Sequence, residues 1–171
     1  GIIYGITQYG LAKQISVSNE EALEFINSYF KKFPEIIISV DTFRSKVAKE
    51  TINSGAAIIN DISGGKMDSN MFATVANLQV PYILMHMIGT PQDMQHNPVY
   101  NDVTQEIISF FAAQIFKLHQ LKLNDIIIDV GFGFGKTNHH NLRTRRSKKK
   151  MKMNFIFYLL VRLLLERDCN I

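Results

Sequence analysis

The sequence predicts an α/β fold with a parallel sheet, arranged as an incomplete (β/α)₈ TIM barrel with about four to five of the eight strand–helix units. Helical patterns of period 3.6 alternate with short apolar runs, and the links between them are mostly short. Each apolar run also ends in a polar residue: Asp41, Asn60 with Asp61, His86 and Asp129. Because ligands collect at the carboxyl ends of parallel strands, such residues on successive strands favour a barrel over a doubly wound sheet.

The first clear helix is expected at residues 20–32, where apolar residues recur with helical spacing. Ser18 and Asn19 are the candidate N-caps, and Pro34 blocks continuation of the helix. The next run, residues 36–40, is apolar except for one serine. It is predicted to be a strand buried on both faces.

The same pattern then repeats along the chain. Further helices are predicted at residues 44–54, 70–78 and 103–121, and further buried strands at residues 56–59, 81–85 and 126–128. Gly55 closes the first of these helices, as a glycine often does at a helix end.

Composition places the chain among globular proteins. Its 171 residues are 46% hydrophobic and 20% charged, which is enough chain for one ordinary core. The single cysteine, Cys169, excludes an internal disulfide. No segment resembles a signal peptide, and no apolar run reaches the roughly 18 residues that span a bilayer. A cytoplasmic protein is therefore expected.

The positive net charge belongs to one end of the chain. Residues 1–136 carry 10 Lys and Arg against 13 Asp and Glu, a net charge of −3. Residues 137–171 carry 9 against 2, a net charge of +7. The mildly acidic body argues against nucleic acid as its main partner.

Four segments carry a resemblance to a known family: SVDTFRSKVA (39–48), AAIINDISGG (56–65), ILMHMIGTPQDMQHNPVYNDV (83–103) and IIIDVGFGFGKT (126–137). In this order and spacing they resemble the central strands of dihydropteroate synthases. The resemblance extends over residues 36 to 137 and is specific because four separate motifs agree. A GxGxG pattern alone, as at residues 131–135, would be weak.

The resemblance implies a transferase that joins a dihydropterin diphosphate to 4-aminobenzoate and releases pyrophosphate. It implies a set of pterin-binding residues: Asp41, Asn60, Ile62, Met85, Asp129 and Phe134. Carboxylates and an amide suit this role, because the pterin ring edge presents adjacent donors and acceptors. Asp41 is also expected to act in catalysis, by stabilising the cationic pterin methylene that forms as the diphosphate leaves.

Each of these residues also has an ordinary structural interpretation. Taken singly, Asp41 could cap a helix, Asp61 could belong to a turn, and Asn60 could bind loop backbone. His86 is expected to be a packed core histidine rather than a catalyst. No metal site is predicted from the pair His139 and His140, because neighbouring side chains on one element point apart.

Other family motifs find no match. The family's first strand carries an asparagine that helps hold Mg²⁺, and this ligand strand is absent from the sequence. The loop after the second strand has its nearest counterpart at residues 6–12, where only Thr7 and Gly10 correspond. The family's later Ser-Arg-Lys and Arg-x-His segments, which supply a pterin-binding lysine and the cations for the diphosphate, are also unmatched. The chain is therefore expected to start late and to lack the diphosphate end of the site.

Two parts are predicted: a partial pterin-binding barrel at residues 1–141, and a basic then apolar tail at residues 142–171. The tail has three interpretations. It could lie on a membrane surface with residues 155–165 inserted, it could be a nucleic-acid patch or nuclear signal, or it could be out-of-frame translation or a truncated gene. The loss of motif together with the change of charge favours the third.

The functional prediction is dihydropteroate synthase-like activity, impaired by the missing segments. A non-catalytic pterin-binding remnant is one alternative. A methyl-tetrahydrofolate-binding methyltransferase subunit is another, although the LMHM and GFGFGKT segments argue against it. The sequence does not decide whether the family's homodimer forms.

Overall fold

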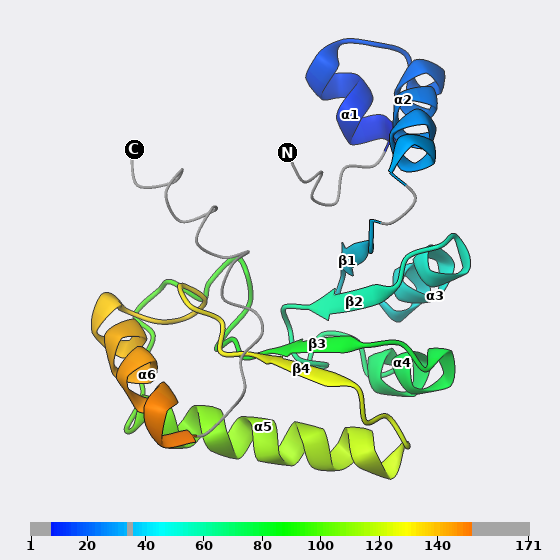
Figure 1. Ribbon diagram of the computed structural model, residues 1–171. Coiled ribbons are helices and arrows are strands. Elements are labelled where there is room, and N and C mark those ends of the chain that lie inside the picture. The colour runs from blue at the N-terminus through cyan, green and yellow to red at the C-terminus, as the bar shows by residue number, and fades with distance from the viewer. Residues whose placement is uncertain (1–7, 34–35, 152–171) are drawn as a thin grey trace.

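A computed structural model describes residues 8–33 and 36–151, in which four parallel strands form one sheet in the order β1-β2-β3-β4 (Figure 1). The strands are β1 Ser39–Asp41, β2 Ile58–Asp61, β3 Tyr82–Met85 and β4 Ile126–Asp129. Each strand pairs with the next one in sequence, which is the arrangement of a barrel wall, whereas a doubly wound sheet reverses its order. The predicted α/β fold, a partial TIM barrel, is confirmed.

The described helices are α1 Gln8–Ile15, α2 Asn19–Lys32, α3 Ser45–Asn53, α4 Met71–Leu78, α5 Val103–Gln120 and α6 Asn138–Met151. The four helices expected from periodicity, α2 to α5, are present within two residues of their predicted ends. Ser18 is the N-cap of α2: its Oγ accepts from the Glu21 N–H at 3.1 Å, and its own N–H donates to Glu21 Oε2 at 2.9 Å. Pro34, expected to end this helix, lies outside the described residues.

The predicted burial of the strands is confirmed for β3 and is wrong for the others, most clearly for the first. The expected strand at residues 36–40 is reduced to β1, and Ile36 and Ile37 are 39% and 70% exposed. Within the described residues β1 pairs only with β2. Its residues Ser39 and Asp41 are exposed, so the strand is not covered on both faces. Of the four strands, only β3 is buried at every position.

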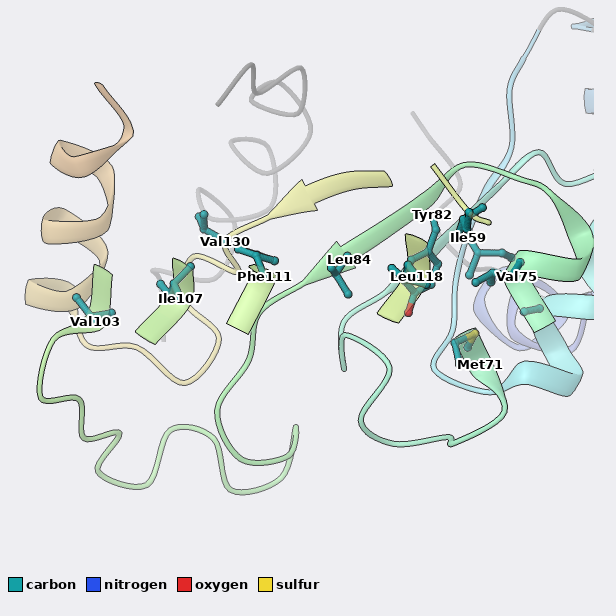
Figure 2. Packing of buried hydrophobic residues seen from close by; sticks show 13 residues of the cluster. Ile59, Met71, Val75, Tyr82, Leu84, Val103, Ile107, Phe111, Leu118 and Val130 are labelled. Carbon is teal, nitrogen blue, oxygen red and sulfur yellow. The ribbon is translucent and has the colours of Figure 1, made fainter. Parts of the chain in front are cut away.

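The core lies between one face of the sheet and the helices α3, α4 and α5. It combines alternate strand residues with the apolar stripes of these helices. Its members include Ala48, Ile59, Met71, Val75, Tyr82, Leu84, Ile107, Phe111, Leu118 and Val130, most of which are shown in Figure 2. Because this core covers one face only, the other face of the sheet is left for the site.

Two helices were not expected from the sequence. α1 packs against α2, and it includes Gly10, one of the two residues matched to the family's second loop. The other, Thr7, lies outside the described residues. α6 runs across the predicted boundary between residues 141 and 142, where the tail was expected to start, and packs on α5.

The rest of the tail, with the apolar run 155–165 and Cys169, also lies outside the described residues. In the part of the chain that the structure describes, no helix is both long and apolar enough to cross a membrane.

We expect Leu118→Ala to lower the free energy of unfolding by about 2–5 kcal/mol, because Leu118 is fully buried on α5 and truncation leaves a cavity. Phe116→Ala on the same helix is the control, since that side chain is 64% exposed and should change stability by about 0.5 kcal/mol or less. Denaturant unfolding measures both. Equal losses would contradict the placement of the core.

Candidate functional site

The strand register places four of the predicted site residues on one face of the sheet. Asp41 pairs with Asn60, and Asn60 pairs with Ile83. Met85 pairs with Asp129, and Met85 lies two positions after Ile83, so it points to the same side. Residues of the helix-facing core occupy the alternate positions. The four site residues therefore share the face opposite the helices, at the carboxyl ends of β1 to β4.

Asp41 and Asn60 lie side by side at this edge. The residue Asp41 is exposed and Asn60 is half-buried. Partial burial of the carboxyl group raises the pKa of Asp41 above its ordinary value, and the nearby charge of Asp61 adds to this. A hydrogen bond from the Asn60 side chain acts in the opposite direction and lowers the pKa of Asp41, but burial is the larger effect. The pair can present an acceptor and a donor next to each other.

Asp129 ends β4 and is half-buried. Its Oδ1 accepts from the Gly131 N–H at 2.9 Å, which fixes the carboxylate against the turn that follows the strand. Phe134 lies farther along the same turn and is half-buried, and its N–H donates to the Gly131 carbonyl at 3.1 Å. Gly131 therefore links Asp129 at the end of β4 to Phe134 in the loop that follows.

Asp61 points away from the shared face and is fully buried. Its Oδ1 accepts from the Ser63 N–H at 2.8 Å, and its Oδ2 accepts from the Gly65 N–H at 2.9 Å and the Tyr82 hydroxyl at 2.6 Å. Burial, followed by the charge of Asp61, raises the pKa of Tyr82, so its hydroxyl stays a donor. Asp61 is therefore a turn residue that holds the loop bearing Ile62, which is half-buried directly after β2.

His86 is a packed histidine, as predicted. Its ring lies 5.0 Å from the Phe110 ring, centroid to centroid, in an edge-to-face contact, and the residue is 4% exposed. Burial, and then the charges of Lys136 and Lys66, lower the pKa of His86 to about 3. The neutral ring accepts at Nδ1 from Lys136 Nζ at 3.0 Å, so its own proton is assigned to Nε2.

Lys136 was missed as a functional candidate from the sequence. It is only 3% exposed, and its Nζ donates to the carbonyl oxygens of His86, Gly131 and Phe134 at 3.0–3.1 Å. The sequence did offer a signal, since the lysine closes the glycine-rich segment 131–135. A lysine on a loop is normally solvated, however, and nothing in the spacing shows that the loop folds around it.

The glycines of this loop allow close backbone approach. At Gly131, with φ of +65°, a Cβ atom would lie 2.1 Å from the His86 carbonyl oxygen. At Gly135, with φ of +60°, it would lie 2.7 Å from the Ile88 carbonyl oxygen. The loop after β4 is thus pressed against the end of β3.

Side chains from the loop after β3 and from α6 hold the β4 loop from outside. The Tyr100 hydroxyl donates to the Gly135 carbonyl at 2.8 Å, and the Gln95 amide donates to the Gly133 carbonyl. The Gly133 N–H donates to Asn141 Oδ1 at 3.1 Å on α6. The two loops and the start of α6 form one hydrogen-bonded unit at the carboxyl edge of the sheet.

The adjacent histidines His139 and His140 lie in the first turn of α6. His140 Nδ1 accepts from the Thr137 N–H at 3.3 Å, and its ring packs 4.8 Å from Tyr100. Within residues 8–33 and 36–151, no group of three or more His, Cys, Asp or Glu side chains is arranged to hold a metal ion.

Comparison with known proteins identifies the family of this chain. The family model described as pterin binding enzyme matches residues 10–163. The chain belongs to this family of pterin-binding enzymes. The relatives and solved structures that it matches include enzymes of folate synthesis.

The folic acid synthesis protein fol1 of Pneumocystis carinii is 39% identical over 133 residues, which are 74% of this chain and 18% of that protein. The dihydropteroate synthase of Escherichia coli K12 is 36% identical over 134 residues, 76% of this chain and 47% of the enzyme. A solved dihydropteroate synthase from Thermus thermophilus, in complex with 4-aminobenzoate, aligns with a TM-score of 0.64 at 33% identity, over 71% of this chain and 48% of that one. The chain spans less than half the length of each of these relatives.

We expect the His86 ring to remain neutral from about pH 5 to about pH 8, because its pKa lies at about 3 in the folded protein. The folded state then binds fewer protons than the unfolded chain, so this group lowers stability as the pH falls from about 6.5 toward 3. Proton NMR of the ring C–H groups measures the titration. A midpoint near 6.5 would contradict the buried contact with Lys136.

Proposed function

We propose that the shared face at the carboxyl edge of the sheet binds a pterin ring, and that the chain carries the pterin-binding part of a dihydropteroate synthase site. The observation that carries the proposal is the alignment of Asp41, Asn60 and Asp129 on one face by the strand register. Two carboxylates and an amide at one edge suit the alternating donors and acceptors of a pterin ring.

Three apolar residues are proposed to surround the ring: Ile62, Met85 and Phe134. Met85 is 3% exposed on the shared face, while Ile62 and Phe134 are half-buried on the loops that follow β2 and β4. An apolar surround makes each missing hydrogen bond costly, so an analogue that lacks one partner is rejected. In this arrangement the polar residues set specificity and the apolar residues exclude water.

Asp41 is proposed to have a second role in the reaction. As the diphosphate leaves, positive charge develops on the pterin methylene carbon, and a carboxylate at the adjacent strand end would stabilise it.

The proposed substrates are a dihydropterin diphosphate and 4-aminobenzoate. Solved relatives support them: a Xanthomonas albilineans dihydropteroate synthase is in complex with 7,8-dihydropteroate, and the Thermus thermophilus enzyme is in complex with 4-aminobenzoate. Magnesium, expected from the family, finds no fitting donor cluster among the described residues, so no step is assigned to it.

A second candidate function is pterin binding without turnover. It requires only the pterin contacts of the shared face, and Asp41, Asn60, Met85 and Asp129 lie together there. A protein of this kind would bind the pterin ring without joining it to 4-aminobenzoate.

Asp129→Asn should weaken hydroxymethyl-dihydropterin binding roughly 10- to 100-fold, because a charge-assisted hydrogen bond contributes about 1.5–3 kcal/mol. Asp125→Asn is the control, since Asp125 is exposed at the opposite end of β4 and should leave binding unchanged. Titration calorimetry measures both affinities. Equal affinities for the two variants would count against the proposed site.

Product formation from a dihydropterin diphosphate and 4-aminobenzoate, measured beside calorimetric pterin binding, separates the two functions. Turnover with binding supports the synthase. Binding without turnover supports the non-catalytic alternative. If neither is detected with the folded chain, the proposed function is wrong.

A further inference from the structure

We propose that Lys136 is a positioning residue for pterin binding. Its ammonium group holds Phe134 and the turn after Asp129 in position against the end of β3. The inference rests on the proposed function, because it concerns the same face of the sheet. It goes beyond that function by assigning a role to a residue that need not touch the ligand.

The contacts of Lys136 join two loops at one atom. Its Nζ donates to the His86 carbonyl at 3.1 Å, at the end of β3, and lies 3.0 Å from His86 Nδ1. It also donates to the carbonyls of Gly131 and Phe134 at 3.0 Å, both in the loop after β4. With three protons and four acceptors, the ammonium is fully engaged, and the side chain is almost completely buried.

This loop needs a donor at its centre. Gly131, Gly133 and Gly135 all have φ between +60° and +81°, so the backbone turns repeatedly and cannot continue the strand ladder. Carbonyls that turn inward without a donor would be buried and unsatisfied, which would destabilise this loop conformation. Lys136 supplies that donor, whereas a methionine of similar length would fill the space and leave the carbonyls unpaired.

Two of these contacts lead directly to proposed pterin contacts. Gly131 accepts from Lys136 through its carbonyl and donates through its N–H to Asp129 Oδ1, so a shift of Gly131 displaces the Asp129 carboxylate. Phe134 accepts from Lys136 through its own carbonyl, so the same shift displaces its ring. Loss of the Lys136 ammonium group would therefore displace two proposed pterin contacts together, the Asp129 carboxylate and the Phe134 ring.

The surroundings make this contact sensitive to pH. Burial lowers the pKa of Lys136 to about 7, the charge of Lys66 acts in the same direction, and Asp129 acts against them. Among the described residues, the neutral ring of His86, which follows β3, contacts Lys136 directly. One layer out, the Tyr100 ring packs against the rings of His86 and His140. Weakly alkaline solution would remove one proton from Nζ and loosen the loop.

The experiment uses the whole chain and three substitutions. Lys136→Met removes the donor, Lys136→Arg keeps a permanent charge, and Lys136→Gln keeps a donor without charge. Lys49→Met is the matched control, because Lys49 is exposed on α3. Hydroxymethyl-dihydropterin affinity is measured by calorimetry at about pH 6 and about pH 8.5, on either side of the Lys136 pKa of about 7. Amide NMR shifts of Gly131 and Phe134 are followed over the same range without ligand.

We expect Lys136→Met to weaken pterin binding roughly tenfold or more at both pH values, since small displacements of binding groups are costly. The unsubstituted chain and Lys49→Met should bind pterin several-fold more weakly at the higher pH than at the lower pH. Lys136→Arg keeps its charge at both pH values, so any change in its affinity reports the titration of the ligand. The loss of affinity in the unsubstituted chain should exceed that change. The Gly131 and Phe134 amide shifts should follow the same transition. If Lys136→Arg does not fold, Lys136→Gln should bind with intermediate affinity and show no transition.

Two failures are distinguishable. If the unsubstituted chain binds pterin, but Lys136→Met binds equally well and the two amides show no transition, the role of Lys136 is overturned and the proposed function stands. If the unsubstituted chain binds no pterin, the proposed function is overturned, while the ligand-free amide shifts still report whether Lys136 positions the loop.

Discussion

The parallel register of β1 to β4 is the constraint on which the rest of the structure depends. Parallel pairing brings the carboxyl ends of all four strands to one edge, and the two-residue period of each strand sorts their side chains between two faces. One face is committed to the apolar core beneath α3, α4 and α5. The polar ends Asp41, Asn60 and Asp129 can therefore gather only on the other face. A shift of one residue in any pairing would move a site residue into the core.

Buried charged side chains hold the loops that follow the strands at this edge. Asp61, buried beneath the edge, fixes the loop after β2 by accepting from two backbone N–H groups and from Tyr82. Lys136 fixes the loop after β4 in the opposite way, because it donates to three backbone carbonyls. A buried anion thus satisfies inward N–H groups and a buried cation satisfies inward carbonyls. Both stabilise loops that carry proposed pterin contacts, Ile62 in one case and Phe134 in the other.

Periodicity predicted the helices and strands of the sheet region well, because each helix has a continuous apolar stripe and each strand is a short apolar run. It failed at residues 36–37, whose apolar side chains are exposed just before β1. The row of Asp41, Asn60 and Asp129 could be predicted because parallel strands align their ends. The role of Lys136 could not be predicted, because its burial depends on how the loop folds back on itself, and no local sequence pattern indicates that. The pterin role of the site residues came from family motifs, and it stays a prediction.

The most direct test of the account is an NMR titration of the labelled chain with hydroxymethyl-dihydropterin. If the ring binds at the shared face, shifts will change at the Asn60 side-chain amide, the Met85 methyl group and the amides of residues 131–135. The methyl groups of Ile107 and Leu118, on the helix-covered face, should stay unchanged. Changes confined to the helix-covered face, or no saturable change at all, would contradict the assignment of the pterin site.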